Sequence, residues 1–331
     1  MLTTVAAGRV FDYSHCIGMY SQSGQGFWTP QDFVLGKNGR VYVLSRGVEQ
    51  LGQRVSKISL DHEFQGQFGS FGGEDGRFIW PRSIDVDQDG RVYVSDEFTN
   101  RISVFDAEGA FRFNWGRFGT DDGLLSGPSG IAFDSQDDLW VVDSLNHRVQ
   151  LFAKTGGFKS NFGQQGTEDG SFEMPWGLCI DRNDDIYVAD WGNNRVQKFS
   201  PEGRYLMSFG GAQRGAGSLD HPAGVAVDSD GDVYVTDWGN GRVQIYEADG
   251  EVLATLHGDM YELSKAGNYL LNRDAAFIKI INRSENVMPV AQAFLRPTGI
   301  AIDEEDRIVV ADGRGRLTVY LKDNEYVEPP T

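Results

Sequence analysis

The chain contains the stretch Pro175-Trp-Gly-Leu-Cys-Ile-Asp181, then Asp184-Asp-Ile-Tyr-Val-Ala-Asp190, then Arg195-Val-Gln-Lys-Phe199. Apolar residues alternate along these segments, and Asp, Asn and Gly separate them. Alternation with a period of two between turn residues is typical of antiparallel hairpins. A fourth alternating segment, Gly203-Arg-Tyr-Leu-Met-Ser-Phe209, follows after another turn. The stretch therefore predicts four short antiparallel strands in succession.

This pattern recurs along the chain, and each copy starts at a proline. The prolines are Pro30, Pro81, Pro128, Pro175, Pro222 and Pro297, separated by 51, 47, 47, 47 and 75 residues. Four strands in about 47 residues is the size of one propeller blade. Six units account for almost all 331 residues. We therefore predict an all-β, six-bladed β-propeller of four-stranded antiparallel blades, forming a single domain over residues 1–331.

The two ends of the chain are predicted to meet in the last blade. The sixth unit supplies three strands, at about 298–302, 307–311 and 317–321. The segment Arg9–Ile17 precedes the first proline as Phe111–Trp115 precedes Pro128. We expect Arg9–Ile17 to be the missing outer strand, because pairing it there removes an exposed edge and closes the ring.

One long insertion, at about 258–295, separates the fifth and sixth units. Its apolar residues at 260, 263, 266, 270 and 271 have roughly helical spacing, so we predict a partly helical segment. The insertion is expected to emerge beside the funnel, the central entrance of the ring, as a lid or a docking surface. The candidate lid residues are Tyr261, Tyr269 and Arg273. The alternative is a decoration packed on the rim of the fifth and sixth blades.

The repeated pattern resembles the NHL repeat, with Pro-x-Gly-[Ile/Leu/Val]-Ala-x-Asp followed by [Val/Ile]-Tyr-Val-x-Asp-x-x-Asn-x-Arg-[Val/Ile]-Gln-x-[Phe/Tyr]. The fourth and fifth units match it nearly throughout, and the third matches closely. The first departs most, with Asp32 in place of Gly and Ser45 in place of Asp. The resemblance implies a propeller fold. It leaves function open, because NHL propellers include lyases, RNA binders, sensors and protein-interaction platforms.

Composition disfavours some of these functional classes. Lys and Arg number 30 against 48 Asp and Glu, a net charge of −18. Nucleic-acid binding is therefore disfavoured, because it depends on clustered cations. Cys16 and Cys179 form neither a disulfide framework nor a zinc spacing. No apolar run is long enough for a membrane span, and no signal peptide is visible, so we predict a cytoplasmic location.

Two repeated motifs are predicted to be structural. Asp–Arg pairs such as Asp190 and Arg195 recur in nearly every unit. A catalytic site is needed once, whereas blade packing is needed six times, and the NHL resemblance implies that these pairs tie blades together. The string from Asp85 to Gly90 resembles the start of a calcium loop but lacks its bidentate Glu, so no metal is predicted there.

Residues that differ between units at equivalent loop positions are the candidate site. In a propeller, the loops that enter the inner strands and those between second and third strands share one face, here called the loop face. Acidic hairpin turns occupy the opposite, acidic face. The loop-face candidates for ligand binding are Gln31, Arg46, Arg82, Ser129, Trp176, Trp191, Trp238 and Thr298. Tryptophans opposite Arg and an amide suit an amphipathic organic molecule with a carboxylate. Alternatively, the tryptophans cap the rim and stack on neighbouring arginines.

Catalytic motifs give little support to an enzyme. NHL-like amidating lyases hold zinc with funnel histidines, but none of the six residues after the prolines is His. No nucleophile elbow or P-loop is present, and no metal or cofactor is predicted. We predict a binding or protein-interaction module whose loop face takes a small organic ligand or a protein partner. The alternative is a lyase or hydrolase acting on a small amphipathic molecule in the Trp/Arg-lined funnel, and RNA binding ranks third.

Overall fold

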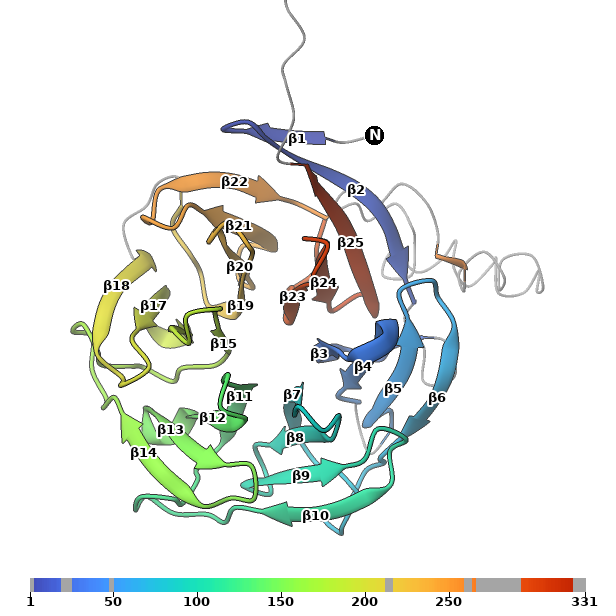
Figure 1. The fold of residues 1–331 in the computed structure, drawn as a ribbon, viewed down its shortest axis with the longest axis vertical. Helices are drawn as coiled ribbons and strands as arrows, with labels where there is room; N and C mark the ends of the chain where they lie inside the picture. The colour runs from blue at the N-terminus through green and yellow to red at the C-terminus, as the bar shows by residue number, and fades with distance from the viewer. Residues whose placement is uncertain are drawn as a thin grey trace, which may run out of the picture.

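The strands form six antiparallel sheets arranged as a ring (Figure 1). The computed structural model describes residues 3–18, 26–47, 51–211, 217–258, 264–265 and 293–323. Within these residues each sheet is one blade, and its strands follow one another from the centre of the ring to the rim. The prediction of an all-β, six-bladed propeller is confirmed.

The first three blades are four-stranded meanders. Blade one contains β3 (Pro30–Leu35), β4 (Arg40–Ser45), β5 (Arg54–Ser59) and β6 (Phe64–Phe68). Blade two contains β7 (Pro81–Val86), β8 (Val92–Asp96), β9 (Arg101–Phe105) and β10 (Phe111–Trp115). Blade three contains β11 (Pro128–Phe133), β12 (Asp138–Asp143), β13 (Arg148–Ala153) and β14 (Phe158–Phe162).

The last three blades continue the ring. Blade four contains β15 (Leu178–Ile180), β16 (Ile186–Asp190), β17 (Arg195–Phe199) and β18 (Tyr205–Gly210). Blade five contains β19 (Pro222–Val227), β20 (Val233–Asp237), β21 (Arg242–Tyr246) and β22 (Val252–Leu256). Blade six contains β23 (Ile300–Ile302), β24 (Ile308–Asp312) and β25 (Arg316–Asp323) together with β2 (Arg9–Ile17) and β1 (Thr3–Ala6).

The N-terminal strand closes the ring as predicted. β2 pairs with β25, from Val10 opposite Asp323 to Ile17 opposite Leu317. The structure adds one strand that the sequence analysis did not predict, because β1 pairs with the outer edge of β2. Ala7 and Gly8 join β1 to β2 with φ values of 48° and 77°, the backbone sign that a two-residue hairpin turn of this kind requires.

Short 3-10 helices supplement the strands: η1 (Lys37–Gly39), η2 (Ser144–Asn146) and η3 (Trp191–Asn193). None of the helices in the described ranges is long and apolar enough to cross a membrane. The cytoplasmic location stays a prediction. The predicted lid residues Tyr261, Tyr269 and Arg273 lie outside the described residues. We keep as a proposal that residues 1–331, with the insertion at about 258–295, form one domain.

The ends of the insertion are fixed to each other. Phe294 donates its backbone N–H to the carbonyl of His257 at 2.8 Å, and the Phe294 side chain is buried against Tyr320. In the other five connections between blades, a Phe or Leu packs on a left-handed Gly nine residues earlier, for example Phe172 on Gly163. The inserted residues therefore extend a connection that otherwise follows the repeat.

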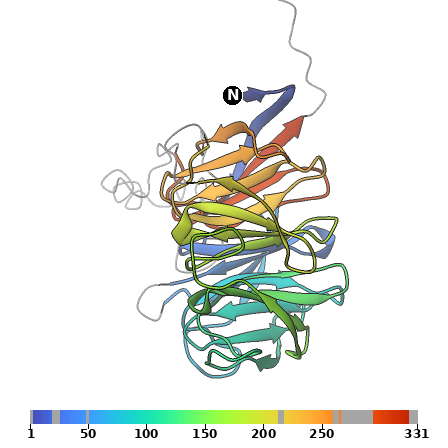
Figure 2. The same ribbon diagram turned by 90° about the vertical axis from the view of Figure 1, so that its left-hand side faces the viewer.

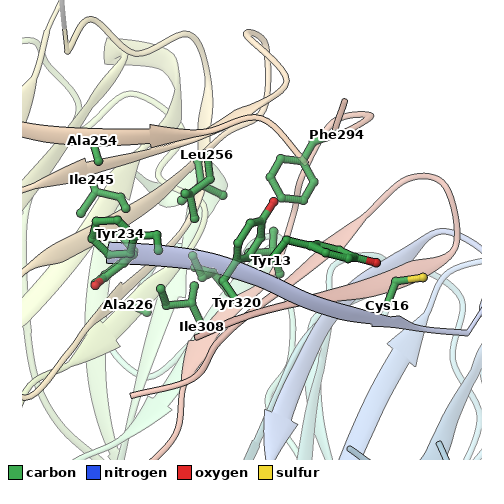
Figure 3. Packing of buried hydrophobic residues seen from close by; sticks show 14 residues of the cluster. Tyr13, Cys16, Ala226, Tyr234, Ile245, Ala254, Leu256, Phe294, Ile308 and Tyr320 are labelled. Carbon is green, nitrogen blue, oxygen red and sulfur yellow. The ribbon is translucent and has the colours of Figure 1, made fainter. Parts of the chain in front are cut away.

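Apolar side chains fill the wedges between neighbouring blades. Six buried clusters are present among the described residues, and each draws on two adjacent blades. In the wedge between blades five and six, Tyr234 and Leu256 face Tyr13 and Tyr320 (Figure 3). Burying such side chains is the main favourable term of folding. The core is thus a ring of interfaces, and each blade depends on both neighbours.

The glycine of the Pro-x-Gly motif allows the inner strands to approach each other. A Cβ on Gly130 would stand 2.7 Å from the carbonyl oxygen of Trp176 in the next blade. A Cβ on Gly224 would stand 2.5 Å from the carbonyl oxygen of Thr298. Side-chain atoms essentially never come so close to backbone atoms, so the motif glycine is required by packing around the axis.

The repeated Asp–Arg pairs hold the connections between blades. Asp190 is fully buried and pairs with Arg195 at 3.0 Å. Asp190 also accepts the backbone N–H of Glu173, and Arg195 donates to the carbonyl of Ser171. Burial raises the pKa of Asp190. The ion pair recurs at Asp143, Asp237 and Asp312, and Asp143 and Asp237 also accept a backbone N–H of the connection, which supports the structural interpretation.

Lysines neutralise the acidic turns. Among the described residues, two groups of three carboxylates place their oxygens close enough to hold a cation: Asp87, Asp89 and Asp137, and Asp228, Asp230 and Asp232. Lys154 lies in the first group, at 2.9 Å from Asp89 and 2.5 Å from Asp137. Lys322 lies in the second, at 2.5 to 3.0 Å from all three aspartates. Each ammonium group joins neighbouring blades.

Two histidines meet where the ring closes, and they predict a dependence of stability on pH. His15 of β2 and His62 of the β5–β6 turn have ring centroids 5.1 Å apart. Burial lowers the pKa of both rings. The pKa of His62 falls to about 4, because the charges of His15 and Lys265 add to the effect of burial. In the unfolded chain both titrate near about 6.5.

Because the folded state binds these protons more weakly, we expect stability to fall as the pH drops from about 6.5 towards about 4. His62 has a φ of 73°, which Asn tolerates better than most residues. His62→Asn should therefore show a smaller loss of urea midpoint between about pH 7.5 and about pH 5 than the parent protein. An equal loss in the two proteins would contradict this expectation.

Candidate functional site

The inner strands enclose a small polar cavity at the axis of the ring. Its volume is about 50 Å³, and its lining residues include Asp32, Ser83, Gly130, Trp176 and Thr298. A cavity of this size holds a few water molecules. It is far below the ~300–1,000 Å³ of typical small-molecule pockets. The axis therefore offers a narrow polar channel, whose lining includes the candidate residues Gln31, Arg82, Trp176 and Thr298.

Arg82 and Trp176 are brought together at this mouth. The guanidinium carbon of Arg82 lies 4.2 Å from the ring centroid of Trp176, although the residues belong to blades two and four. Ser129 of blade three, which lies between them, is small and buried. Trp176 also packs on Trp191, with 5.6 Å between ring centroids. The sequence analysis predicted Arg82 opposite the tryptophans, with stacking on arginines as the alternative; Arg82 stacks directly on Trp176 in a cation–π contact.

A charged cluster continues from Arg82 towards blade one. Glu97 forms an ion pair with Arg82 and lies 3.8 Å from Arg46. Arg46 stacks on Trp80 at 5.0 Å, and Arg82 donates to the amide oxygen of Gln31 at 3.4 Å. The pKa of Arg46 is lowered by burial and by the neighbouring Arg82. The cluster of Arg46, Glu97 and Arg82 is therefore a second feature of the loop face.

Two other candidates lie apart from this cluster. Trp191 contacts His221, with 4.0 Å between ring centroids, and His221 pairs with Asp220. Trp238 carries Arg296 over its ring at 4.6 Å. These contacts match the alternative in which tryptophans cap the rim and stack on neighbours. The ring of Trp238 is thus covered by Arg296, not by Arg82.

The small polar candidates are engaged with the backbone. Ser129 donates to the carbonyl of Trp176 at 2.7 Å, and Thr298 donates to the carbonyl of Pro30 at 2.9 Å. Each bond joins one blade to the next. Gln31 donates to the carbonyl of Thr29 at 3.2 Å and accepts from Arg82. Ser129 and Thr298 thus stabilise the channel wall, and Gln31 positions Arg82.

Two partly buried carboxyl groups lie on inner strands, Asp32 on β3 and Asp85 on β7. Asp32, which replaces the motif Gly, accepts a hydrogen bond from Ser83 at 2.6 Å and another from the Ile84 N–H. Asp85 accepts the N–H of Phe133 in the next blade at 2.8 Å. Burial raises the pKa of Asp32 to about 6 and that of Asp85 to about 7. These hydrogen bonds join blade one to blade two and blade two to blade three.

Large apolar side chains are exposed along one part of the loop face. Trp80, Phe98, Leu145 and Met174 expose 43%, 54%, 52% and 38% of their surface. We call these four residues the apolar arc. They come from the loops of blades two, three and four that precede the inner strand or join the second and third strands. The sequence analysis did not single out any of them.

A signal for part of the arc was available in the sequence. The residue before each blade proline also differs between units: Thr29, Trp80, Gly127, Met174, His221 and Arg296. Five of these, all except Trp80, have φ values between 42° and 62°, a conformation that non-glycine residues adopt rarely. None of the predicted site residues occupies a position directly before a blade proline.

The histidines do not assemble a metal site. His147 accepts the backbone N–H of Met174 at 3.1 Å, His221 contacts Trp191, and His15 and His62 pair elsewhere. The two possible metal-binding groups in the described ranges consist of aspartates alone. Cys179 lies on the inner strand β15, and burial raises its pKa strongly. A thiol with so strongly raised a pKa is a poor nucleophile near neutral pH.

Larger cavities lie on the acidic face. One of about 400 Å³ is lined by residues including Lys37, Arg40, Tyr42 and Glu108. Another of about 350 Å³ lies beside it, against Leu60 and Arg307. Arg40 already pairs with Glu108 at 2.9 Å. Seen edge-on (Figure 2), the strands run between this face and the loop face, so these cavities are remote from the arc.

Six structurally repeated blades and a face of blade-specific loops define a β-propeller of the repeat type. The family model of the NHL repeat matches residues 125–152, 172–199 and 219–246, which fall in blades three, four and five. The chain therefore contains NHL repeats in blades three to five of a six-bladed propeller. A search of curated protein sequences gives no match.

Solved structures confirm the fold. Virginiamycin B lyase from Staphylococcus aureus aligns with a TM-score of 0.59 at 13% identity, covering 94% of this chain and 99% of the lyase. A streptogramin B lyase gives 0.59 at 12% identity, with 95% and 98% covered. A protein of unknown function from Bacteroides thetaiotaomicron gives 0.63 at 20% identity, with 95% and 76% covered. At these identities the similarity shows the fold alone.

Proposed function

We propose that this protein is an interaction module that binds a protein partner through its loop face, centred on the apolar arc. The observation that carries the proposal is the exposure of Trp80, Phe98, Leu145 and Met174, at 38–54% of their surface, on neighbouring loops of three blades. Clustered exposed apolar residues with polar residues around them are typical of protein-interaction sites.

Contacts between neighbouring loops make the arc continuous. Trp80 and Phe98 pack edge to face, with ring centroids 5.3 Å apart. A Cβ on Gly127 would touch both Leu145 and the side chain of Glu97, so Leu145 lies next to the loop that carries Phe98. Met174 lies next to this loop as well, because its backbone N–H donates to the ring of His147, two residues after Leu145. The arc therefore offers one surface rather than four isolated side chains.

The geometry favours a partner on the surface over an enclosed small molecule. The axial cavity of about 50 Å³ is too small for an organic ligand. Trp176 and Trp238 already carry arginines on their rings. The candidate residues Gln31, Arg46, Arg82, Trp176 and Trp191 thus form the inner border of the arc. We propose that they contact the partner, with Ser129 and Thr298 supporting them from the channel wall.

Selection from a displayed library of random 12-residue peptides, on the full-length protein, tests this proposal. Peptides should be enriched on the parent protein and lost on a Phe98→Ser/Leu145→Ser variant, because serine removes the apolar contact area at two separate loops. A Phe158→Ser/Leu206→Ser variant is the control, since both residues are exposed on outer strands at the rim. Equal melting temperatures verify that the variants fold.

The outcomes separate clearly. Peptides retained by the rim variant and lost by the arc variant support the loop face as the binding surface. Enrichment that survives the arc variant, or no enrichment on the parent protein, contradicts the proposal.

A further inference from the structure

We propose that the partner segment bound on the apolar arc carries a carboxylate, received between Arg46 and Arg82, where Glu97 now lies. The segment would be a short acidic peptide with apolar residues beside its Asp or Glu. This inference rests on the proposed function of the loop face and names the chemistry of its partner.

The charge of the cluster is the first argument. Two guanidinium groups share one oxygen of Glu97, in direct contact with Arg82 and at 3.8 Å from Arg46. The side chains of Arg46, Arg82 and Glu97 are exposed by only 23%, 15% and 25%. Two cations and one anion, held partly out of water, leave one positive charge for a further anion to neutralise.

Asp96 adds little to this balance. Its carboxylate also acts on Arg46, more weakly than that of Glu97. The oxygens of Asp96, however, accept the backbone N–H groups of Ile79, Trp80, Phe98 and Thr99. Its charge is therefore stabilised by the loop that it holds in place. Burial and the charge of Arg82 lower the pKa of Arg46, and the two carboxylates only partly oppose them.

The arginines are held in place before any partner binds. The guanidinium of Arg46 stacks on Trp80 at 5.0 Å, and that of Arg82 stacks on Trp176 at 4.2 Å. Gln31 accepts a further hydrogen bond from Arg82 at 3.4 Å. Fixing a guanidinium plane in advance lowers the entropic cost of receiving a carboxylate, whose oxygens match its parallel N–H groups.

The position of the cluster also determines which residues flank the carboxylate in the bound peptide. Trp80 belongs both to the apolar arc and to the Arg46 stack, and Phe98 directly follows Glu97. A carboxylate at the arginines therefore places the neighbouring residues of the same peptide over Trp80 and Phe98. Apolar residues beside an acidic one fit this surface, whereas a Lys-rich segment would meet two cations. Glu97 then acts as an internal competitor for the incoming carboxylate.

Two labelled peptide pools test the inference on the full chain by fluorescence anisotropy. One pool has a central Glu and the other a central Gln, with flanking positions drawn from Phe, Leu, Ser and Gly. The Glu pool should bind about tenfold more tightly, because hydrogen bonds between charged groups replace neutral ones. Added salt should shrink that difference.

Variants locate the effect. Glu97→Gln should strengthen binding of the Glu pool, because the competing carboxylate is removed while the side-chain shape is kept. Arg82→Met should reduce the Glu pool to the level of the Gln pool, and Arg46→Met provides a second test if Arg82→Met alters folding. Arg77→Met is the matched control, since Arg77 is an exposed arginine, paired with Glu74, in the connection that precedes β7.

Specific results would overturn the inference. Equal binding of the two pools would contradict the proposed carboxylate. Weaker binding of the Glu pool by a folded Glu97→Gln variant would show that Glu97 only positions the arginines. If equal binding is abolished by Phe98→Ser/Leu145→Ser, the interaction surface stands and only the carboxylate falls. If neither pool binds the parent protein more tightly than it binds the Phe98→Ser/Leu145→Ser variant, both proposals fail.

Discussion

Deleting residues 1–17 is expected to unfold the whole ring rather than to remove a loose end. β2 supplies a full strand to blade six, and Phe11, Tyr13, Cys16 and Ile17 are buried in the wedges on both sides. Exposing these residues and the facing core lowers the free energy of unfolding by about 10 kcal/mol, at ~1.5–3 kcal/mol per large apolar side chain. That loss equals the total stability of a typical domain, ~5–15 kcal/mol.

Circular dichroism with a thermal scan checks this expectation. Deletion of residues 1–6 is the control, because it removes only β1, which pairs with the outer edge of β2 and whose residues are partly buried or exposed. The shorter deletion should melt cooperatively near the parent temperature. A cooperative transition of normal amplitude after deletion of residues 1–17 would show that the ring closes without β2.

Lys322→Met should cause the largest loss of stability among single substitutions of charged residues at the blade interfaces. The side chain of Lys322 is 1% exposed and lies within 3.0 Å of Asp228, Asp230 and Asp232. Burial alone would lower the pKa of Lys322, but the hydrogen bonds that its ammonium donates to the three carboxylates raise it. Removing a buried partner leaves charges uncompensated and costs about 3–5 kcal/mol.

Urea unfolding near neutral pH measures this loss. Arg9 still reaches Asp232 at 2.8 Å, so the variant should fold with a lower midpoint. The loss should shrink at acidic pH, because protonation of the aspartates removes the charge that Lys322 balances. Lys159→Met is the control, since Lys159 is 44% exposed in its pair with Asp138, and such pairs contribute under about 1 kcal/mol. Equal midpoints for Lys322→Met and the parent would contradict the account.

Periodicity predicted the blades well because each strand has one buried face. The segments Arg9–Ile17 and Phe111–Trp115 are strands with the predicted bounds. The first strand of blade six begins at Ile300, later than predicted from Thr298, because Thr298 and Gly299 pack against blade one near the axis. β1 was not predicted, because none of its four residues is fully buried and its sequence Thr-Thr-Val-Ala does not alternate apolar with polar residues.

The candidate site was less predictable from sequence than the blades. The positions of Arg82 and Trp176 on one face followed from the repeat, but their contact depends on the small Ser129 between them. The bridging role of Glu97 and the stack of Arg46 on Trp80 depend on how long side chains cross between blades. Periodicity assigns a residue to a face, whereas such contacts are set by the space around each side chain.

Hydrogen-exchange mass spectrometry, with the most strongly enriched peptide, tests most directly whether the loop face is the binding surface. The account predicts protection of backbone amides in residues 97–100 and 144–147, which carry Phe98 and Leu145. The acidic-face turns at residues 87–91 and 303–307 should not change. Protection confined to those turns, or to residues 36–42 beside the larger cavities, would contradict the account and place the partner on the opposite face.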